Sequence, residues 1–205
     1  LPAEVYEKFL SAAQEVKSID DFQAKITSSL LRYIEKKSIS DLTVSGLENL
    51  DKAYKYLFIS NHRDIILDSA YLNLHLFDAG ISTSQIAIGD NLMQHRISEI
   101  LFFTNKSFVV KRTGTPRELY GHSVALSQYI LRIISEKIDS VWIAQAEGRA
   151  KDGNDKTQTG LLKMISLSGG DDLKSHFQAL QMVPVSISYE FDPTDLLKTQ
   201  EYLAK

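Results

Sequence analysis

The sequence predicts an α/β protein in which helices flank a central mixed, mostly parallel sheet, with a helical appendage at the N-terminus. Short apolar runs of strand length alternate along most of the chain with longer segments of helical periodicity. Polar or charged residues directly follow several of these runs, as they do where parallel strands end at one edge of a sheet. These observations favour one α/β domain preceded by helices.

Residues 1–40 form the predicted N-terminal helical region. Apolar side chains recur there at helical spacing in two runs, first Val5, Phe9, Ala13 and Val16 and then Phe22, Ile26, Leu30 and Tyr33. Asp20 and Asp21 predict the cap of the second helix. Neither run has a dense basic face, so we expect both helices to pack on the main body rather than to lie on a membrane.

Residues 41–205 form the predicted α/β domain. Strands are predicted at Leu42–Val44, Tyr54–Ser60, Gln85–Gly89, Ser107–Val110, Val141–Ala144 and Met182–Ser188. Helices are predicted at Asp64–Phe77, Leu92–Phe103, Arg117–Ile134, Leu161–Leu167, Leu173–Leu180 and Asp195–Ala204. A turn is expected at Ser45-Gly46 and a polar loop over Gly153–Gly160. Pro184, inside the last apolar run, indicates a strand start, a sheet edge or a bulge.

The composition excludes several classes of function. The formal net charge of −3 provides no overall positive field, so we expect no nucleic-acid partner. The chain has no cysteine and its 5 histidines show no paired ligand spacing, so we expect no metal ion and no cofactor. No apolar run approaches the ~20 residues of a membrane-spanning helix. The sequence ends at Lys205 within a helical pattern, and we expect a fragment truncated at its C-terminus.

The segment after the predicted strand Tyr54–Ser60 is the strongest candidate for chemistry. It contains His62, with Asp64 and Asp68 within two helical turns. Histidine is well suited to proton transfer at neutral pH, and a nearby carboxylate selects its tautomer and stabilises its charged form. The pattern is also typical of a histidine that caps a helix or is hydrogen-bonded in the core. His62-Arg63-Asp64 imitates the protein-kinase catalytic loop, but the other kinase motifs are absent.

Cations follow two further predicted strands. The residues concerned are Lys111, Arg112, Glu147, Gly148, Arg149 and Lys151. Arginine forks match phosphate geometry, and a glycine turn flanked by cations can direct backbone N–H groups and positive charge at an anion. The alternative is a solvated strand end and an exposed charged loop. Asp152, Asn154 and Asp155 hint at a calcium loop, but the spacing of an EF-hand is missing.

Taken in order, these segments resemble the glycerol-phosphate acyltransferase family, which comprises the glycerol-3-phosphate and lysophosphatidate acyltransferases of membrane lipid synthesis. The resemblance begins at Val44-Ser45-Gly46-Leu47-Glu48-Asn49-Leu50, continues through Leu57-Phe58-Ile59-Ser60-Asn61-His62 and extends to Glu190. Two blocks depart from the family pattern. The family's H-x-x-x-x-D has Leu67 at its last position here, with Asp68 one residue later. Glu147-Gly148-Arg149 is one residue shorter than the usual Glu-Gly-Thr-Arg or Glu-Gly-Gly-Arg.

The resemblance implies an enzyme that moves a fatty acyl group from acyl-CoA or acyl-carrier protein to a hydroxyl of glycerol-3-phosphate or a lysophosphatidate. It makes residues 41–205 the acyltransferase domain. His62 would be the general base, oriented by Asp68, with Asp64 as the alternative. The acceptor phosphate would bind four cations, Lys111, Arg112, Arg149 and Lys151. Glu147 and Gly148 would contact the acceptor or order their loop, and the protein would be cytoplasmic, attached peripherally to the inner face of the membrane.

Two other functions stay open. The departures in the first and third blocks suggest an O-acyltransferase that acts on a phosphate-free lyso-lipid, such as an amino-acid-based lipid. A non-catalytic lipid- or anion-binding module would retain the fold without turnover.

Overall fold

A five-stranded sheet forms the centre of the computed structural model, which describes residues 3–151 and 155–204. Its strands are β1 (Leu57–Ser60), β2 (Ser84–Gly89), β3 (Ser107–Val110), β4 (Ser140–Ala144) and β5 (Met182–Val185). Their order is β3-β2-β4-β1-β5, and all four pairs of neighbours are parallel. The α/β class is therefore confirmed, and within the described residues the sheet is parallel and not mixed.

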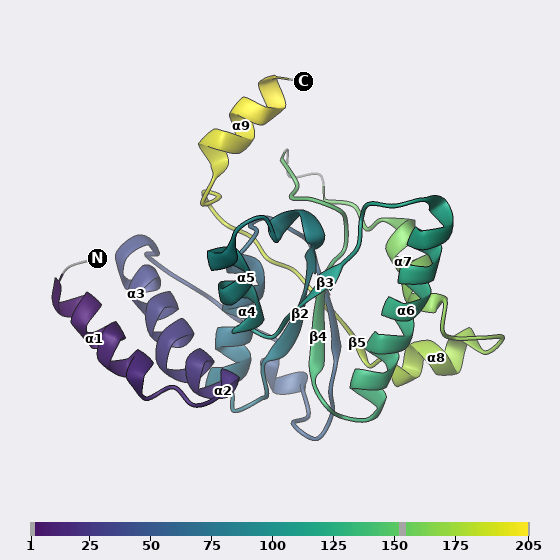
Figure 1. Ribbon diagram of the computed structural model, residues 1–205, viewed down its shortest axis with the longest axis horizontal. Coiled ribbons are helices and arrows are strands. Elements are labelled where there is room, and N and C mark those ends of the chain that lie inside the picture. The colour runs from purple at the N-terminus through teal and green to yellow at the C-terminus, as the bar shows by residue number, and fades with distance from the viewer. Residues whose placement is uncertain (1–2, 152–154, 205) are drawn as a thin grey trace.

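Helices cover both faces of the sheet (Figure 1). The α-helices are α1 (Ala3–Gln14), α2 (Ile19–Phe22), α3 (Ser28–Ser38), α4 (Leu67–Asp78), α5 (Arg96–Phe103), α6 (Pro116–Ser135), α7 (Thr159–Ser166), α8 (Leu173–Ala179) and α9 (Asp195–Leu203). Short turns of other helix types are η1 (Gln23–Thr27), η2 (Leu47–Asn49) and η3 (Asp90–Leu92). Helices α6, α7 and α8 lie on one side of the sheet, and α4 and α5 lie on the other.

The alternation of side chains along the strands explains this two-sided core. Leu57 and Val141 belong to the cluster that packs against α6 and α7, whereas Phe58 and Trp142 belong to the cluster that packs against α4. Successive residues of a strand point to opposite faces, so adjacent apolar residues serve both clusters. A parallel sheet needs both faces covered, which is why its strands are apolar throughout.

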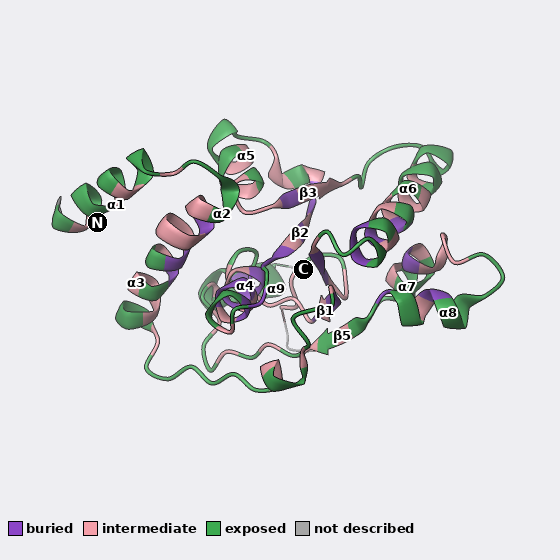
Figure 2. Cartoon of the chain, turned by 90° about the horizontal axis from the view of Figure 1, so that it is seen from below, coloured by how far each residue is buried: buried purple, intermediate pink, exposed green. Residues whose placement is uncertain are grey.

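The second helical run of the N-terminal region packs on the body of the protein, as predicted. Leu31 of α3 shares a small cluster with Tyr71 and Leu74 of α4. The Thr83 hydroxyl donates a 2.8 Å hydrogen bond to the Gln23 side chain. Helix α1 contains no buried residue among those described, and Figure 2 colours it as exposed and intermediate. The cap of α2 is Ser18, not the predicted Asp20-Asp21, which lie in its first turn.

Several predicted elements of the α/β domain differ from the structure. The predicted strand Leu42–Val44 is irregular and exposed, since it has no neighbouring strand to pair with. The last strand stops at Val185 because its partner β1 also stops, at Ser60, with which Val185 is in register. The helix predicted from Asp64 begins only at Leu67.

Other expectations about the domain have mixed outcomes. Pro184 lies on β5 at the edge of the sheet, as expected of a residue without an N–H donor. The loop predicted at Gly153–Gly160 lies partly outside the described residues, and α7 already begins at Thr159.

Across residues 3–151 and 155–204, none of the helices has the length and apolar character needed to cross a membrane.

Candidate functional site

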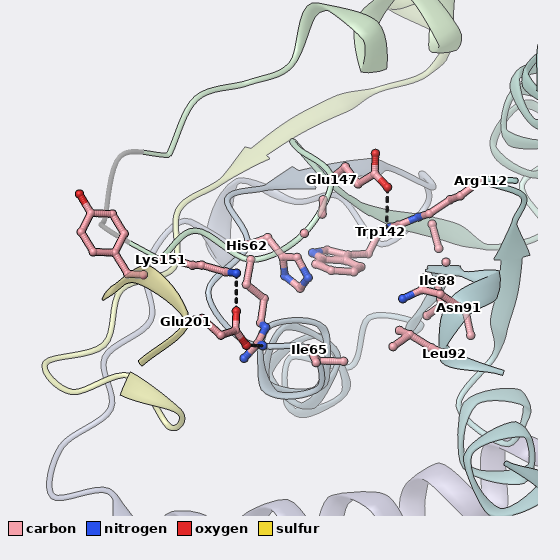
Figure 3. Close-up of a pocket in the computed structure, with 16 residues that line it drawn as sticks. His62, Ile65, Ile88, Asn91, Leu92, Arg112, Trp142, Glu147, Lys151 and Glu201 are labelled. Carbon is pink, nitrogen blue, oxygen red and sulfur yellow. Dashed lines mark hydrogen bonds and ion pairs between the residues drawn. The ribbon is translucent and has the colours of Figure 1, made fainter. Parts of the chain in front are cut away.

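A pocket of about 610 Å³ opens where the carboxyl ends of the parallel strands meet (Figure 3). Its lining comes from the segments that follow four strands, with His62 after β1, Asn91 after β2, Arg112 after β3 and Glu147 after β4. Helix α9 adds Glu201 and Tyr202. Ligands of open α/β sheets bind outside the carboxyl ends of the strands, so this pocket is the candidate functional site.

His62 is paired with Asp68 in the wall of the pocket. The ring Nδ1 lies 3.0 Å from Asp68 Oδ2, and the Asp68 side chain is completely buried. The carboxylate can only accept at this contact, so Nδ1 carries the proton and Nε2 is the basic nitrogen. Trp142 packs edge-on against the imidazole, with 6.0 Å between the ring centroids. The ring is thereby held in one orientation within the pocket lining.

Donors surround the buried Asp68 carboxylate. Oδ2 also accepts the backbone N–H groups of Arg63, at 2.7 Å, and Asp64, at 2.9 Å. Oδ1 accepts the Tyr189 hydroxyl at 2.9 Å. A carboxylate is costly to bury unless hydrogen bonds replace its water, and these contacts supply the replacement. Burial and the negative charge of Asp68 raise the pKa of Tyr189 well above its usual value, so its hydroxyl stays a donor.

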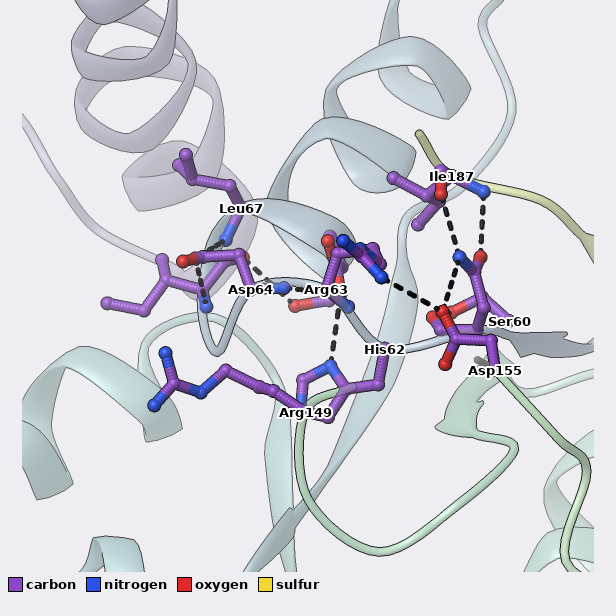
Figure 4. A network of polar contacts seen from close by, with 12 residues as sticks. Ser60, His62, Arg63, Asp64, Leu67, Arg149, Asp155 and Ile187 are labelled. Carbon is purple, nitrogen blue, oxygen red and sulfur yellow. Dashed lines mark hydrogen bonds and ion pairs between the residues drawn. The ribbon is translucent and has the colours of Figure 1, made fainter. Parts of the chain in front are cut away.

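The other candidate, Asp64, has a structural role. Its Oδ1 accepts the N–H groups of Ile66 and Leu67, each at 2.9 Å, at the start of α4 (Figure 4). Residues 62–66 are therefore a loop, and Asp68 lies in the first turn of the helix that follows. This loop takes up the extra residue of the H-x-x-x-x-x-D spacing. Of the two aspartates, only Asp68 contacts His62 among the hydrogen bonds of the described residues.

A second layer of charges connects the His62 loop to α9. Arg63 pairs with Asp192 at 2.6 Å and with Asp155 at 3.6 Å. Lys198 of α9 is only 2% exposed, and its ammonium group lies 3.0 Å from Asp192 and contacts the Arg63 carbonyl. The hydrogen bonds that Arg63 donates to Asp192 raise the pKa of Arg63. Burial alone would raise the pKa of Asp192, but hydrogen bonds from Lys198 and Arg63 lower it.

Asn61 makes a further long-range connection. Its side-chain amide donates to the Ile187 carbonyl and accepts the Ile187 N–H, both at 2.7 Å. This pair of bonds joins the segment after β1 to the segment after β5, where the strand ladder has already ended. It therefore brings Tyr189, two residues further on, within reach of Asp68.

Three of the four predicted phosphate ligands line the pocket, namely Arg112, Arg149 and Lys151. Lys111 does not: it is absent from the lining, and its ammonium group lies 3.8 Å from Asp90. Successive residues of an extended segment point in opposite directions, so Lys111 and its neighbour Arg112 diverge. Glu147 and Gly148 lie in the lining, as the predicted contacts to an acceptor require.

Each pocket cation faces a carboxylate. Arg112 lies 3.3 Å from Glu147, and Arg149 lies 3.8 Å from Glu201. Lys151 forms a closer ion pair with the other oxygen of Glu201. Two carboxylates thus face three cations, and an added anion would compete with them for the same N–H donors.

Gly89 makes room for one of these cations. A Cβ atom at this position would lie 2.6 Å from Arg112 Nε and 2.5 Å from the Asn91 side-chain oxygen. The absence of a side chain thus lets the Arg112 guanidinium lie across the end of β2.

Several residues of the site carried no signal in the sequence. Tyr189 lies in the last segment of the family resemblance, but its local pattern indicates no role. Lys198, Glu201 and Tyr202 lie on a helix whose sequence pattern is ordinary. Tyr189 and Lys198 contact positions more than 100 residues away, and Glu201 pairs with cations on another loop, which local spacing does not reveal. Among residues 3–151 and 155–204, there is no group of three or more His, Cys, Asp or Glu side chains arranged to hold a metal ion.

No protein-family model matches this sequence, and neither does any curated protein.

Proposed function

We propose that this protein is an acyltransferase of the glycerol-phosphate acyltransferase type. It would transfer a fatty acyl group from acyl-CoA or acyl-carrier protein to a hydroxyl of glycerol-3-phosphate or a lysophosphatidate. The observation that carries the proposal is the pairing of His62 with buried Asp68 inside a pocket that also contains Arg112, Arg149 and Lys151. A base and a set of cations in one pocket suit an acceptor that has both a hydroxyl and a phosphate.

The proposed reaction needs no covalent enzyme intermediate. His62 Nε2 removes the proton of the acceptor hydroxyl as its oxygen attacks the thioester carbonyl, and a tetrahedral intermediate forms. The carbon–sulfur bond then breaks, an ester is released, and the leaving thiolate takes the proton back from the imidazolium. Asp68 holds Nδ1–H and stabilises the imidazolium throughout, as a carboxylate does in a serine-hydrolase triad. General-base catalysis of this type contributes roughly 10²–10⁴ in rate.

The lining of the pocket suits both the phosphate of the acceptor and the acyl chain of the donor. Arg112, Arg149 and Lys151 would hold the phosphate and so position the hydroxyl at His62. The apolar part of the lining would take the start of the acyl chain, through Ile65, Ile88, Leu92 and Trp142.

Peripheral attachment to the membrane is part of the proposal. Helix α5 presents Ile97, which is 82% exposed, together with Ile100 and Phe103. Ile19 of α2 lines the same shallow hollow as Ile100 and Phe103. Exposed apolar side chains on one short helix can enter the interfacial region of a bilayer, where a lipid acceptor would reside. We infer that α5 rests on the inner face of the membrane.

The test is an acyl-transfer assay with labelled palmitoyl-CoA and palmitoyl-acyl-carrier protein, in the presence of liposomes. Acceptors are glycerol-3-phosphate, lysophosphatidate and a phosphate-free lyso-lipid. His62→Ala removes the proposed base, and His122→Ala is the control because His122 is an exposed histidine of α6. Transfer to a phosphorylated acceptor that His62→Ala abolishes and His122→Ala retains supports the proposal. Absence of transfer from wild-type protein to every acceptor contradicts it.

The charge balance of the pocket favours a second candidate. Glu147 and Glu201 already offset most of the positive charge of the three cations, so a phosphate-free lyso-lipid, such as an amino-acid-based lipid, is the alternative acceptor. Transfer confined to the phosphate-free acceptor, with loss in His62→Ala, would select this function. Lipid or phosphate binding without turnover, unchanged in His62→Ala, would instead indicate a non-catalytic binding module.

A further inference from the structure

Glu201 places a carboxylate of the chain itself on two of the pocket cations. One of its oxygens pairs with Lys151 and the other lies 3.8 Å from the Arg149 guanidinium. Figure 3 shows Glu201 reaching into the pocket from α9, close to Lys151. The Glu201 side chain remains 44% exposed, so it is not enclosed in the core.

Contacts nearer the N-terminal end of α9 hold the helix in this position. Buried Lys198, one turn earlier on the helix, pairs with Asp192 and contacts the Arg63 carbonyl. The Thr194 hydroxyl, just before α9, accepts a 2.8 Å hydrogen bond from Arg149 Nη1. The base of the helix is thus anchored to the His62 loop, while Glu201 lies further along, where its side chain can change partners without release of the helix.

A phosphate at this place would need the donors that Glu201 now engages. Guanidinium and ammonium groups bind carboxylate and phosphate oxygens through the same N–H donors. Two anions cannot share Arg149 and Lys151 without strong repulsion, so the binding of one requires the displacement of the other.

We propose that Glu201 is an internal competitor for the anion site at Arg149 and Lys151, and thereby sets the affinity of the pocket for phosphorylated ligands. The inference depends on the proposed function only in taking that ligand to be the acceptor phosphate. A purely structural role is a poor account of Glu201, because its side chain is 44% exposed and ion pairs that water reaches contribute little to folding. Substitution of Glu201 by glutamine keeps the size of the side chain and removes the competing charge.

The experiment measures the binding of inorganic phosphate and of sn-glycerol 3-phosphate by titration calorimetry, without any acyl donor. Glu201→Gln should bind both ligands about three- to tenfold more tightly than wild type. Its midpoint of thermal unfolding should be unchanged. Glu136→Gln, which removes one exposed negative charge at the end of α6, should bind like wild type and so control for overall charge. In the double variant Lys151→Gln, Glu201→Gln, the gain should be lost.

Several results would overturn the inference. These are unchanged or weaker binding in Glu201→Gln, an equal gain in Glu136→Gln, or the absence of phosphate binding in wild type and Glu201→Gln alike. The transfer assay then separates this inference from the proposed function. If Glu201→Gln binds phosphate more tightly but no variant transfers an acyl group, the role of Glu201 as a competitor is supported and the acyltransferase function is rejected. If acyl transfer depends on His62 but wild type and Glu201→Gln bind phosphate equally, the acyltransferase function is supported and the role of Glu201 as a competitor is rejected.

Turnover provides a second readout. Glu201→Gln should lower KM for glycerol-3-phosphate by about three- to tenfold and leave kcat within about twofold, since the charge competes with binding and not with the reaction. KM for a phosphate-free lyso-lipid should not fall. A fall in kcat with KM unchanged would show that Glu201 acts on the reaction and would overturn the inference.

Discussion

The Tyr189 hydroxyl donates to Asp68 Oδ1 at 2.9 Å, on the carboxylate oxygen opposite the one that holds His62. The orientation of the proposed base therefore depends on a residue that follows the last strand of the sheet. Asp68 is held from one side by its own loop and from the other by Tyr189. A positioning role for Tyr189 follows directly from this arrangement.

Tyr189→Phe should lower kcat about tenfold and leave KM nearly unchanged. The ring still fills its place, but Asp68 loses one donor, and a hydrogen bond to a charged group contributes about 1.5–3 kcal/mol. The free energy of unfolding should decrease by an amount within that range. Steady-state kinetics and urea denaturation measure the two effects. Tyr120→Phe, at an exposed site on α6, is the control, and wild-type kcat in Tyr189→Phe would reject the positioning role.

Asp68→Asn should lower kcat by roughly 10²–10⁴, because an amide has no charge to stabilise the imidazolium and its NH2 group, turned to His62, selects the wrong tautomer. Asp64→Asn is the matched control. Its amide oxygen can still accept the N–H groups of Ile66 and Leu67, so activity and stability should stay near wild type. Equal loss of kcat in both variants would mean that the loop geometry, and not the His62–Asp68 pair, is what matters.

Gly89→Ala should raise KM for a phosphorylated acceptor about three- to tenfold with little change in stability. The added Cβ would meet the flexible ends of Arg112 and Asn91, which can move aside at low cost but then leave the pocket. Kinetics with glycerol-3-phosphate and with a phosphate-free lyso-lipid measure the change. Gly160→Ala is the control, since a Cβ there meets nothing within 4 Å. An equal rise of KM for both acceptors would argue against a phosphate role for Arg112.

Asp192→Asn should lower the free energy of unfolding by about 2–4 kcal/mol near neutral pH, since Lys198 and Arg63 lose their shared carboxylate. The pKa of Asp192 is lower in the folded protein than its ordinary value of 3.8. The stabilisation is therefore fully present above that value and is lost as the pH falls through the folded pKa. The difference in the free energy of unfolding between wild type and Asp192→Asn should therefore shrink below about pH 4.

Denaturant unfolding from about pH 3 to about pH 7 measures this dependence. Asp41→Asn, at an exposed position, should show no comparable gap. A gap that is constant over the whole range would mean that Asp192 acts through packing and not through its charge.

Replacement of both Ile97 and Ile100 by aspartate should abolish most binding to anionic liposomes while the fold and pocket remain intact. Both side chains are exposed on α5, so the change removes apolar contact and adds repulsion without disturbing the core. Liposome sedimentation measures the loss. Ile138→Asp, at an exposed site between α6 and β4, should bind like wild type. Equal binding by all variants would reject α5 as the membrane contact.

Much of the sheet was predictable because strand patterns are local. The predicted Ser107–Val110 coincides with β3, and four of the other predicted strands overlap β1, β2, β4 and β5. The prediction of a strand at Leu42–Val44 is wrong because a short segment becomes a strand only when a neighbouring strand offers hydrogen bonds, and within the described residues this one has none. The helix predicted from Asp64 started late because Asp64 uses its side chain to satisfy the first N–H groups of α4.

The sequence by itself determined the α/β class, the position of His62 after a strand and the presence of cations after two others, because these depend on short-range periodicity and composition. Only the tertiary structure decided that Asp68 and not Asp64 contacts His62, that Tyr189 contacts Asp68, and that Glu201 lines the pocket while Lys111 does not. Those outcomes depend on hydrogen bonds and ion pairs between segments far apart in the chain. A carboxylate that is buried or near a cation is stabilised by whichever donors the fold brings to it, and no local pattern specifies which ones those are.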